Sequence, residues 1–187
     1  MTEIEIKAHV YDRNRVVKKL NEFAIYEDSV IRDDVYYKTE NSSKPGIRLR
    51  KETRDRGIEY LITYKRKENR IGEDGLCIEV NNELETSIAD PTVLAAFLID
   101  SGYKAYLTKH KEVKDWIYQI DETTKATLEL CAVPPLGDFL EIEVLSEKND
   151  EDTVSSVRDK LKFLLSKAEI PERDIEDRYY SEMLNSK

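Results

Sequence analysis

The chain has 187 residues, of which 40% are hydrophobic and 37% are charged, and its formal net charge is −9. This content of apolar residues argues against a disordered chain, and the negative charge argues against binding a nucleic-acid backbone over the whole surface. Two cysteines cannot form a disulfide framework, and no stretch approaches the roughly eighteen apolar residues of a membrane span. We therefore expect a cytoplasmic protein with neither a nucleic acid nor a membrane as its partner.

The first predicted element is a strand over residues 2–10. Its isoleucines face one side, and Glu3, Glu5 and Lys7 face the other. A helix follows from the capping residue Asp12 to about residue 24, because its apolar residues recur at helical spacing.

The rest of the chain alternates between short strands and a few amphipathic helices. Strands are predicted at residues 34–38, 46–52, 59–67, 76–81, 106–111, 113–120, 126–132 and 139–145. Helices are predicted at residues 90–101 and 152–168, and a short helix after Pro171 should end near Leu184. No linker rich in Gly, Ser or Pro interrupts the pattern, so we expect one domain over residues 1–187.

Several of these strands carry charged residues at every second position, so that the charges share one face. The shared faces belong to Glu3, Glu5 and Lys7; Arg48 and Arg50; Thr63, Lys65 and Lys67; Lys109 and Lys111; and Glu141 and Glu143. For any single strand, a solvated sheet face explains this pattern most simply. The separation of basic pairs from acidic pairs instead favours an α+β fold in which about eight antiparallel strands close into a barrel with its charges pointing inward.

Charges of both signs inside a barrel are unfavourable unless they have partners. A polyanion bound with a divalent metal ion satisfies both signs. Carboxylates bind hard cations such as Mg²⁺, and Arg and Lys bind phosphate oxygens. The strand pattern therefore indicates a site for a phosphate-rich ligand and a metal ion.

Four sequence segments resemble the motifs of a known protein family. Glu3 to Lys7 reads as the ExExK signature of the CYTH superfamily, the triphosphate tunnel metalloenzymes, and three further segments resemble that family in the same order. These are Asp34-Val35-Tyr36-Tyr37, Ile47-Arg48-Leu49-Arg50 and Leu136-Gly137-Asp138-Phe139-Leu140-Glu141-Ile142-Glu143. The resemblance covers essentially the whole chain and looks closest to the class IV adenylyl cyclases.

The resemblance implies an eight-stranded antiparallel tunnel with helices packed outside, which acts on a nucleoside or other triphosphate with Mg²⁺ or Mn²⁺. The residues expected to bind metal are Glu3, Glu5, Glu129, Glu141 and Glu143. The residues expected to hold the triphosphate are Lys7, Arg48, Arg50, Lys65, Lys67, Lys109 and Lys111, and the additional candidates are Asp34 and Glu79.

This chain departs from the family pattern at three places. The strand at 76–81 keeps only Glu79 of a more acidic motif, Cys131 stands where an acid is usual, and Lys111 stands where Arg is common. Glu129, two residues before Cys131 on the same face, is a candidate replacement for the missing acid. These departures leave open the number of metal ions and the choice of substrate.

Three functions are compatible with this sequence. The first is a class IV adenylyl cyclase that converts ATP into cyclic AMP and pyrophosphate. The second is a triphosphatase that hydrolyses thiamine triphosphate or inorganic triphosphate, and the third is a non-catalytic binder of triphosphate or polyphosphate. The sequence identifies no catalytic residue, and it leaves the oligomeric state open, a homodimer included.

Overall fold

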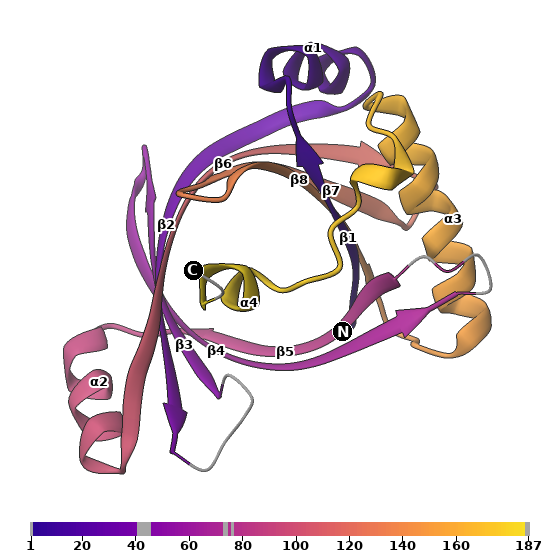
Figure 1. The fold of residues 1–187 in the computed structure, drawn as a ribbon. Coiled ribbons are helices and arrows are strands. Elements are labelled where there is room, and N and C mark those ends of the chain that lie inside the picture. Colours follow the sequence, from indigo (N-terminus) through magenta and orange to yellow (C-terminus); the bar gives the residue numbers. More distant parts are fainter. Residues whose placement is uncertain (1, 41–45, 73–74, 76, 186–187) are drawn as a thin grey trace.

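A computed structural model describes residues 2–40, 46–72, 75 and 77–185, without the side chains of residues 65–69, 77, 82 and 83. Within this part of the chain, eight strands close an antiparallel barrel in the order β1-β5-β4-β3-β2-β6-β7-β8 (Figure 1). The strands are β1 (Thr2–Val10), β2 (Ile25–Thr39), β3 (Ile47–Arg54), β4 (Gly57–Ile71), β5 (Cys77–Ser87), β6 (Tyr103–Gln119), β7 (Lys125–Val133) and β8 (Gly137–Ser146). This arrangement confirms the predicted α+β class and the closed eight-stranded barrel.

Three helices lie outside the ring of strands (Figure 1). They are α1 (Arg13–Phe23), α2 (Pro91–Asp100) and α3 (Glu151–Lys167), and each begins after an aspartate whose carboxylate accepts a hydrogen bond from a backbone N–H of the first turn. None of the helices in the described ranges is both long enough and apolar enough to cross a membrane.

The last segment of the chain takes a different place. After the 3₁₀ turn η1 (Glu172–Asp174), it runs into the ring of strands and ends there in α4 (Tyr180–Asn185) (Figure 1). Met183 of this helix is buried with inward-facing residues such as Val113 and Phe139. One short helix therefore lies inside the barrel, in addition to the helices predicted outside it.

The hydrophobic core lies between the outer surface of the barrel and helices α1 and α3. The alternation in β1 sends Ile4 and Ile6 to this outer side, where both are at most 2% exposed, and Leu161 and Leu164 of α3 are fully buried in the same cluster. Because the apolar half of each strand is used for packing outside, the polar half must face the inside of the barrel. The core thus determines which side chains can form the site.

The predicted extents of β2 and β6 were wrong. The strand expected at 34–38 begins at Ile25, and its register with β6 shifts between Tyr26 and Asp28, which disrupts the alternation that the prediction relied on. The strands expected at 106–111 and 113–120 form one continuous strand, β6, since Glu112 between them pairs with Ile31 of β2.

The position of the core predicts the cost of shortening a side chain on β8. Leu140→Ala should lower the free energy of unfolding by about 2–5 kcal/mol, because Leu140 is fully buried against the helices. Leu145→Ala on the same strand, where the side chain is 51% exposed, should change it by no more than about 0.5 kcal/mol. Urea denaturation of both variants measures the difference, and equal losses would contradict this location of the core.

Candidate functional site

The inside of the barrel holds a cavity of about 520 Å³ whose lining is mostly charged. Every strand of the described barrel contributes to it. The charged lining residues are Glu3, Glu5, Lys7, Arg32, Arg48, Arg50, Glu52, Arg54, Glu59, Glu79, Glu85, Lys109, Lys111, Glu129, Glu141 and Glu143. The structure therefore brings the predicted metal residues and most of the predicted phosphate residues into one cavity. The side chains of Lys65 and Lys67 lie outside the described part of the chain.

Three carboxylates of the cavity form a compact group on neighbouring strands. β1 pairs with β8 so that Glu5 stands opposite Glu143, and Glu3 lies two residues away on the same face as Glu5. One carboxylate oxygen from each of the three lies within 4.8 Å of the other two. Clustered carboxylate oxygens are the donors that Mg²⁺ and Mn²⁺ prefer, so this group fits the metal ions that the sequence resemblance implies.

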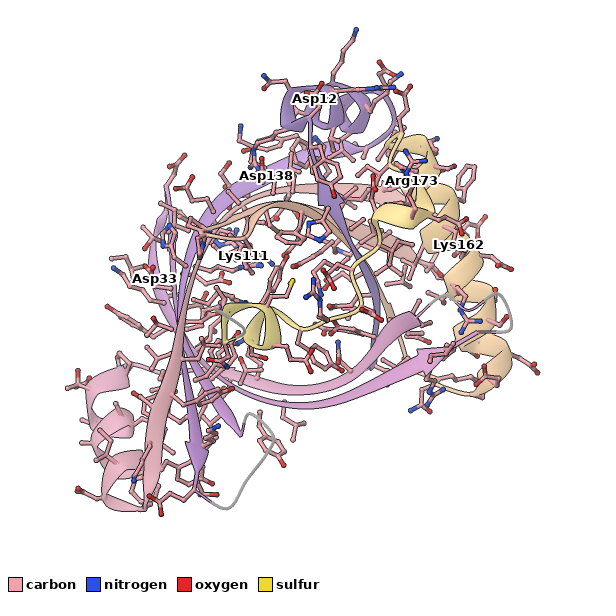
Figure 2. All side chains as sticks on the ribbon, in the orientation of Figure 1. Asp12, Asp33, Lys111, Asp138, Lys162 and Arg173 are labelled. Atoms are coloured by element: carbon pink, nitrogen blue, oxygen red, sulfur yellow. The ribbon has the colours of Figure 1, made fainter. Side chains whose placement is uncertain are left out.

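A second group lies on β7 and β8, where Glu129, Cys131 and Glu141 also come within 4.8 Å of one another. The ammonium of Lys111 donates hydrogen bonds to Glu129, at 3.0 Å, and to Glu141. Figure 2 shows Lys111 inside the ring of strands. Burial lowers the tendency of Lys111 to carry charge, but the negative groups around it outweigh burial and hold its pKa well above the usual range.

A buried carboxylate on β2 organises the basic strands. Asp34, whose residue is 1% exposed, accepts two hydrogen bonds from the guanidinium of Arg50, at 2.7 and 3.1 Å, and its Oδ2 lies 3.1 Å from the ammonium of Lys109. The hydroxyl of Tyr36 also donates to it. Burial alone would raise the pKa of Asp34, but the charges of Arg50 and Lys109 outweigh burial and hold the pKa well below its usual range. Asp34 therefore fixes the two cations in the cavity wall.

Arg32 links two further carboxylates across the cavity. Its Nε donates to Glu52 and its Nη1 lies 2.8 Å from both carboxylate oxygens of Glu129. Burial disfavours the ionised form of Glu129, but Arg32 and Lys111 together hold its pKa well below the usual range. Glu129 is therefore an ionised carboxylate with two cations beside it.

Asp115 has the opposite character. It is 6% exposed, and its Oδ1 is buried without a hydrogen-bond partner in the described structure. Burial, and next the negative charge of Glu129, raise the pKa of Asp115 to about 7. This carboxyl therefore keeps its proton at pH values where ordinary aspartates have lost theirs.

The other predicted residues also have partners inside the barrel. Lys7 lies 3.4 Å from a carboxylate oxygen of Glu79, which was an additional candidate. The guanidinium of Arg48 donates to the hydroxyl of Thr63 at 3.0 Å and to Glu85 at 3.2 Å. These pairs hold the side chains of Lys7 and Arg48 in defined positions.

The first residue of α4 enters this network. The ring of Tyr180 lies between three lysine ammonium groups, with distances to its centroid of 5.0 Å for Lys7, 5.1 Å for Lys109 and 5.8 Å for Lys111. Such distances are within the range of cation–π attraction. Burial and the nearby charge of Glu141 raise the pKa of the Tyr180 phenol well above its usual range. The C-terminal segment thus forms part of the cavity wall.

Sequence reasoning missed some of these lining residues. Arg32 lies two residues before Asp34, and Glu52 and Arg54 continue the alternation of Arg48 and Arg50, so the same period-two rule would have found them. Tyr180 is different because nothing in its own segment indicates that α4 enters the barrel.

The fold and its lining define a class: an antiparallel β-tunnel with a charged interior. The chain belongs to the CYTH domain family, whose model matches residues 1–180. Members of this family are metal-dependent enzymes that act on triphosphates. The family resemblance predicted from the sequence is thereby confirmed, and no curated protein matches the chain.

Solved structures share the whole fold at low sequence identity. The PH1819 protein of Pyrococcus horikoshii is 23% identical with a TM-score of 0.76, and the match covers 98% of each chain. A candidate adenylate cyclase from Vibrio parahaemolyticus is 19% identical over 99% of this chain and 98% of its own, with a TM-score of 0.72. A candidate adenylyl cyclase from Hippeastrum, described as having a dominant triphosphatase activity, is 15% identical over 99% of this chain and 95% of its own, with a TM-score of 0.63.

The Asp34 network yields a prediction about stability. Asp34→Ala should lower the free energy of unfolding by about 3–5 kcal/mol, because it leaves Arg50 and Lys109 buried without their carboxylate. Asp33→Ala, on the outer face of the same strand, removes a half-exposed partner of His110 and should cost less than about 1 kcal/mol. Chemical denaturation of both variants measures the contrast, and similar losses would mean that the buried network contributes little.

Asp115 yields a prediction about pH. Its pKa is about 7 in the folded protein and about 4 in the unfolded chain, so the folded state binds more protons between these values and loses stability as the pH rises through that window. The amide side chain in the Asp115→Asn variant cannot ionise. The stability of the variant relative to the original protein should therefore rise between pH 5 and pH 8, as measured by urea denaturation. A stability difference that stays constant over this range would contradict the raised pKa.

Proposed function

We propose that this chain is a divalent-metal-dependent enzyme that cleaves a nucleoside triphosphate, and that its reaction is the class IV adenylyl cyclase reaction from ATP to cyclic AMP and pyrophosphate. The observation that carries the proposal is the single cavity that combines the Glu3, Glu5 and Glu143 group with the cations of β3 and β6. A triphosphate with a bound metal ion presents the complementary charges to both groups.

The cations would bind the phosphate chain in two ways. The guanidinium groups of Arg48 and Arg50 present paired N–H donors that match two phosphate oxygens at once. Lys7 and Lys109 present ammonium charges that can follow negative charge as it develops on the leaving group. Because Asp34 already holds Arg50 and Lys109 in position, little reorganisation is needed when the ligand enters.

The carboxylates of Glu3, Glu5 and Glu143 would hold Mg²⁺ or Mn²⁺. A metal ion bound there supplies polarisation of the phosphate and a lowered pKa for the attacking hydroxyl. In the cyclase reaction the 3′-oxygen forms a bond to the α-phosphorus, the bond from that phosphorus to the bridging oxygen breaks, and pyrophosphate leaves while the hydroxyl proton is released.

A less charged part of the lining favours an organic triphosphate over an inorganic one. Tyr36, Gly46, Ile47 and Leu61 line the same cavity and present little charge. A ligand pocket usually combines apolar surface with a few well-placed polar groups, and here such a surface would suit the nucleoside end of ATP.

A triphosphatase is the second candidate. In this reaction water attacks the terminal phosphorus of thiamine triphosphate or inorganic triphosphate, and no base pocket is required. The strongly charged lining favours it, and the Hippeastrum structure, with its described triphosphatase activity, shares the fold. Binding of a triphosphate without any reaction would correspond to the third function considered from the sequence.

One assay separates these functions. The protein is incubated with ATP, thiamine triphosphate or tripolyphosphate in Mg²⁺ or Mn²⁺, and the products are resolved. We expect cyclic AMP and pyrophosphate from ATP. We expect Glu5→Gln to lower the rate by at least about 10-fold, because losing a metal ligand should cost no less than losing a residue that only hydrogen-bonds to a ligand.

Glu112→Gln provides the control, since this glutamate lies on the outer face of β6 with its side chain 64% exposed. It should leave the rate unchanged. Orthophosphate as the main product would favour the triphosphatase, and full activity of Glu5→Gln would refute the metal assignment.

A further inference from the structure

The two carboxylate groups in the cavity differ in composition. The first contains Glu3, Glu5 and Glu143, and the second contains Glu129, Cys131 and Glu141. Both are compact enough for a metal ion, since their ligand atoms lie within 4.8 Å of one another. Only the first consists wholly of carboxylates, so the second must be judged by what else occupies it.

A protein cation already occupies the second group. The Nζ atom of Lys111 lies 3.0 Å from Oε2 of Glu129 and also donates a hydrogen bond to Oε2 of Glu141. Lys111 is 3% exposed, so water compensates little of this charge. An ammonium between two carboxylates has the same electrostatic role as a metal ion between them.

Glu129 carries a second cation as well. The Nη1 atom of Arg32 lies 2.8 Å from each of its two carboxylate oxygens. Lys111 and Arg32, which Glu129 shares with Glu52, therefore place two cations beside Glu129 and Glu141. A divalent ion entering this group would meet these two protein cations, whose repulsion opposes its binding.

The third member of the group is a poor ligand for the metals in question. Cys131 is fully buried, and its Sγ atom lies 3.4 Å from the backbone carbonyl oxygen of Glu129, as a donor to it. A thiol must lose its proton to bind a metal, and Mg²⁺ and Mn²⁺ prefer oxygen to sulfur. Where the family usually has an acid, this chain therefore offers a protonated side chain.

We propose that this protein binds one divalent ion, at Glu3, Glu5 and Glu143, and that the ammonium of Lys111 replaces a second ion between Glu129 and Glu141. The inference rests on the proposed metal-dependent function and specifies how many ions the site takes. Part of the positive charge near the substrate then belongs to a side chain of the protein, so it is present at every metal concentration.

Lys111 was also predicted to bind phosphate. In that role it would have to give up its ion pairs with Glu129 and Glu141. If Lys111 left Glu129 and Glu141 for the substrate, it would leave two buried carboxylates with only Arg32 as a partner, which is unfavourable unless a metal ion takes its place. A second bound ion and a displaced Lys111 would therefore occur together, and both can be observed.

The test is to count and locate Mn²⁺, added alone, in the intact protein. Crystals soaked in Mn²⁺ reveal each ion by its anomalous scattering, and electron paramagnetic resonance of the dissolved protein gives the number of bound ions. We expect one ion per chain, within coordination distance of Glu3, Glu5 and Glu143, and Lys111 still between Glu129 and Glu141. An ion between Glu129 and Glu141 would overturn the inference and leave the proposed function intact. No bound ion at all would contradict the proposed function itself.

Lys111→Ala tests the replacement directly. It removes the ammonium from between Glu129 and Glu141 and leaves Arg32 as the remaining cation beside Glu129. The number of bound Mn²⁺ ions should therefore rise from one to two, with spin coupling between the two ions. Lys109→Ala removes another buried lysine, whose partner is Asp34, and it should leave the number at one. A single ion in well-folded Lys111→Ala would overturn the role assigned to Lys111. If that variant does not fold, Lys111→Arg, which keeps the charge, must bind one ion, and two ions in it would overturn the inference.

Discussion

The structure depends on opposite charges that face one another inside a closed barrel. Asp34 holds Arg50 and Lys109, and Glu129 holds Arg32 and Lys111, at distances of 2.7–3.1 Å. Pairs of this kind cost desolvation free energy, and a well-packed apolar interior would often be as stable. Their retention in a barrel whose hydrophobic core lies elsewhere is therefore better explained by binding than by stability.

The position of the core makes this division possible. Because α1 and α3 pack against the outer side of the sheet, many inward positions can carry a charge, and the strand register places Asp34 opposite both Arg50 and Lys109. The result is a cavity whose cations are held by carboxylates before a ligand arrives. The proposed triphosphate and its metal ion would replace these protein partners with little movement of the side chains. Such preorganised charges are what electrostatic stabilisation of a transition state requires.

Much of this could be predicted from the chain because two-residue alternation decides which side chains share a face. The rule placed Glu3, Glu5, Arg48 and Arg50 in one cavity, and it failed where the backbone breaks the period. The register shift in the first half of β2 is one example, whereas Arg32, two residues before Asp34, keeps the period and could have been predicted by the same rule. The entry of α4 into the barrel was not predictable, since Met183 and Tyr180 are held there by strands that are distant in the sequence.

The central claim is that the cavity binds a triphosphate together with a divalent ion. Calorimetric titration of tripolyphosphate into the protein, once with Mg²⁺ and once with a chelator, measures it most directly. The account predicts one bound triphosphate per chain and an affinity at least about tenfold higher with Mg²⁺, equal to about 1.4 kcal/mol of coupling. No binding in Mg²⁺, or the same affinity in chelator, would contradict it.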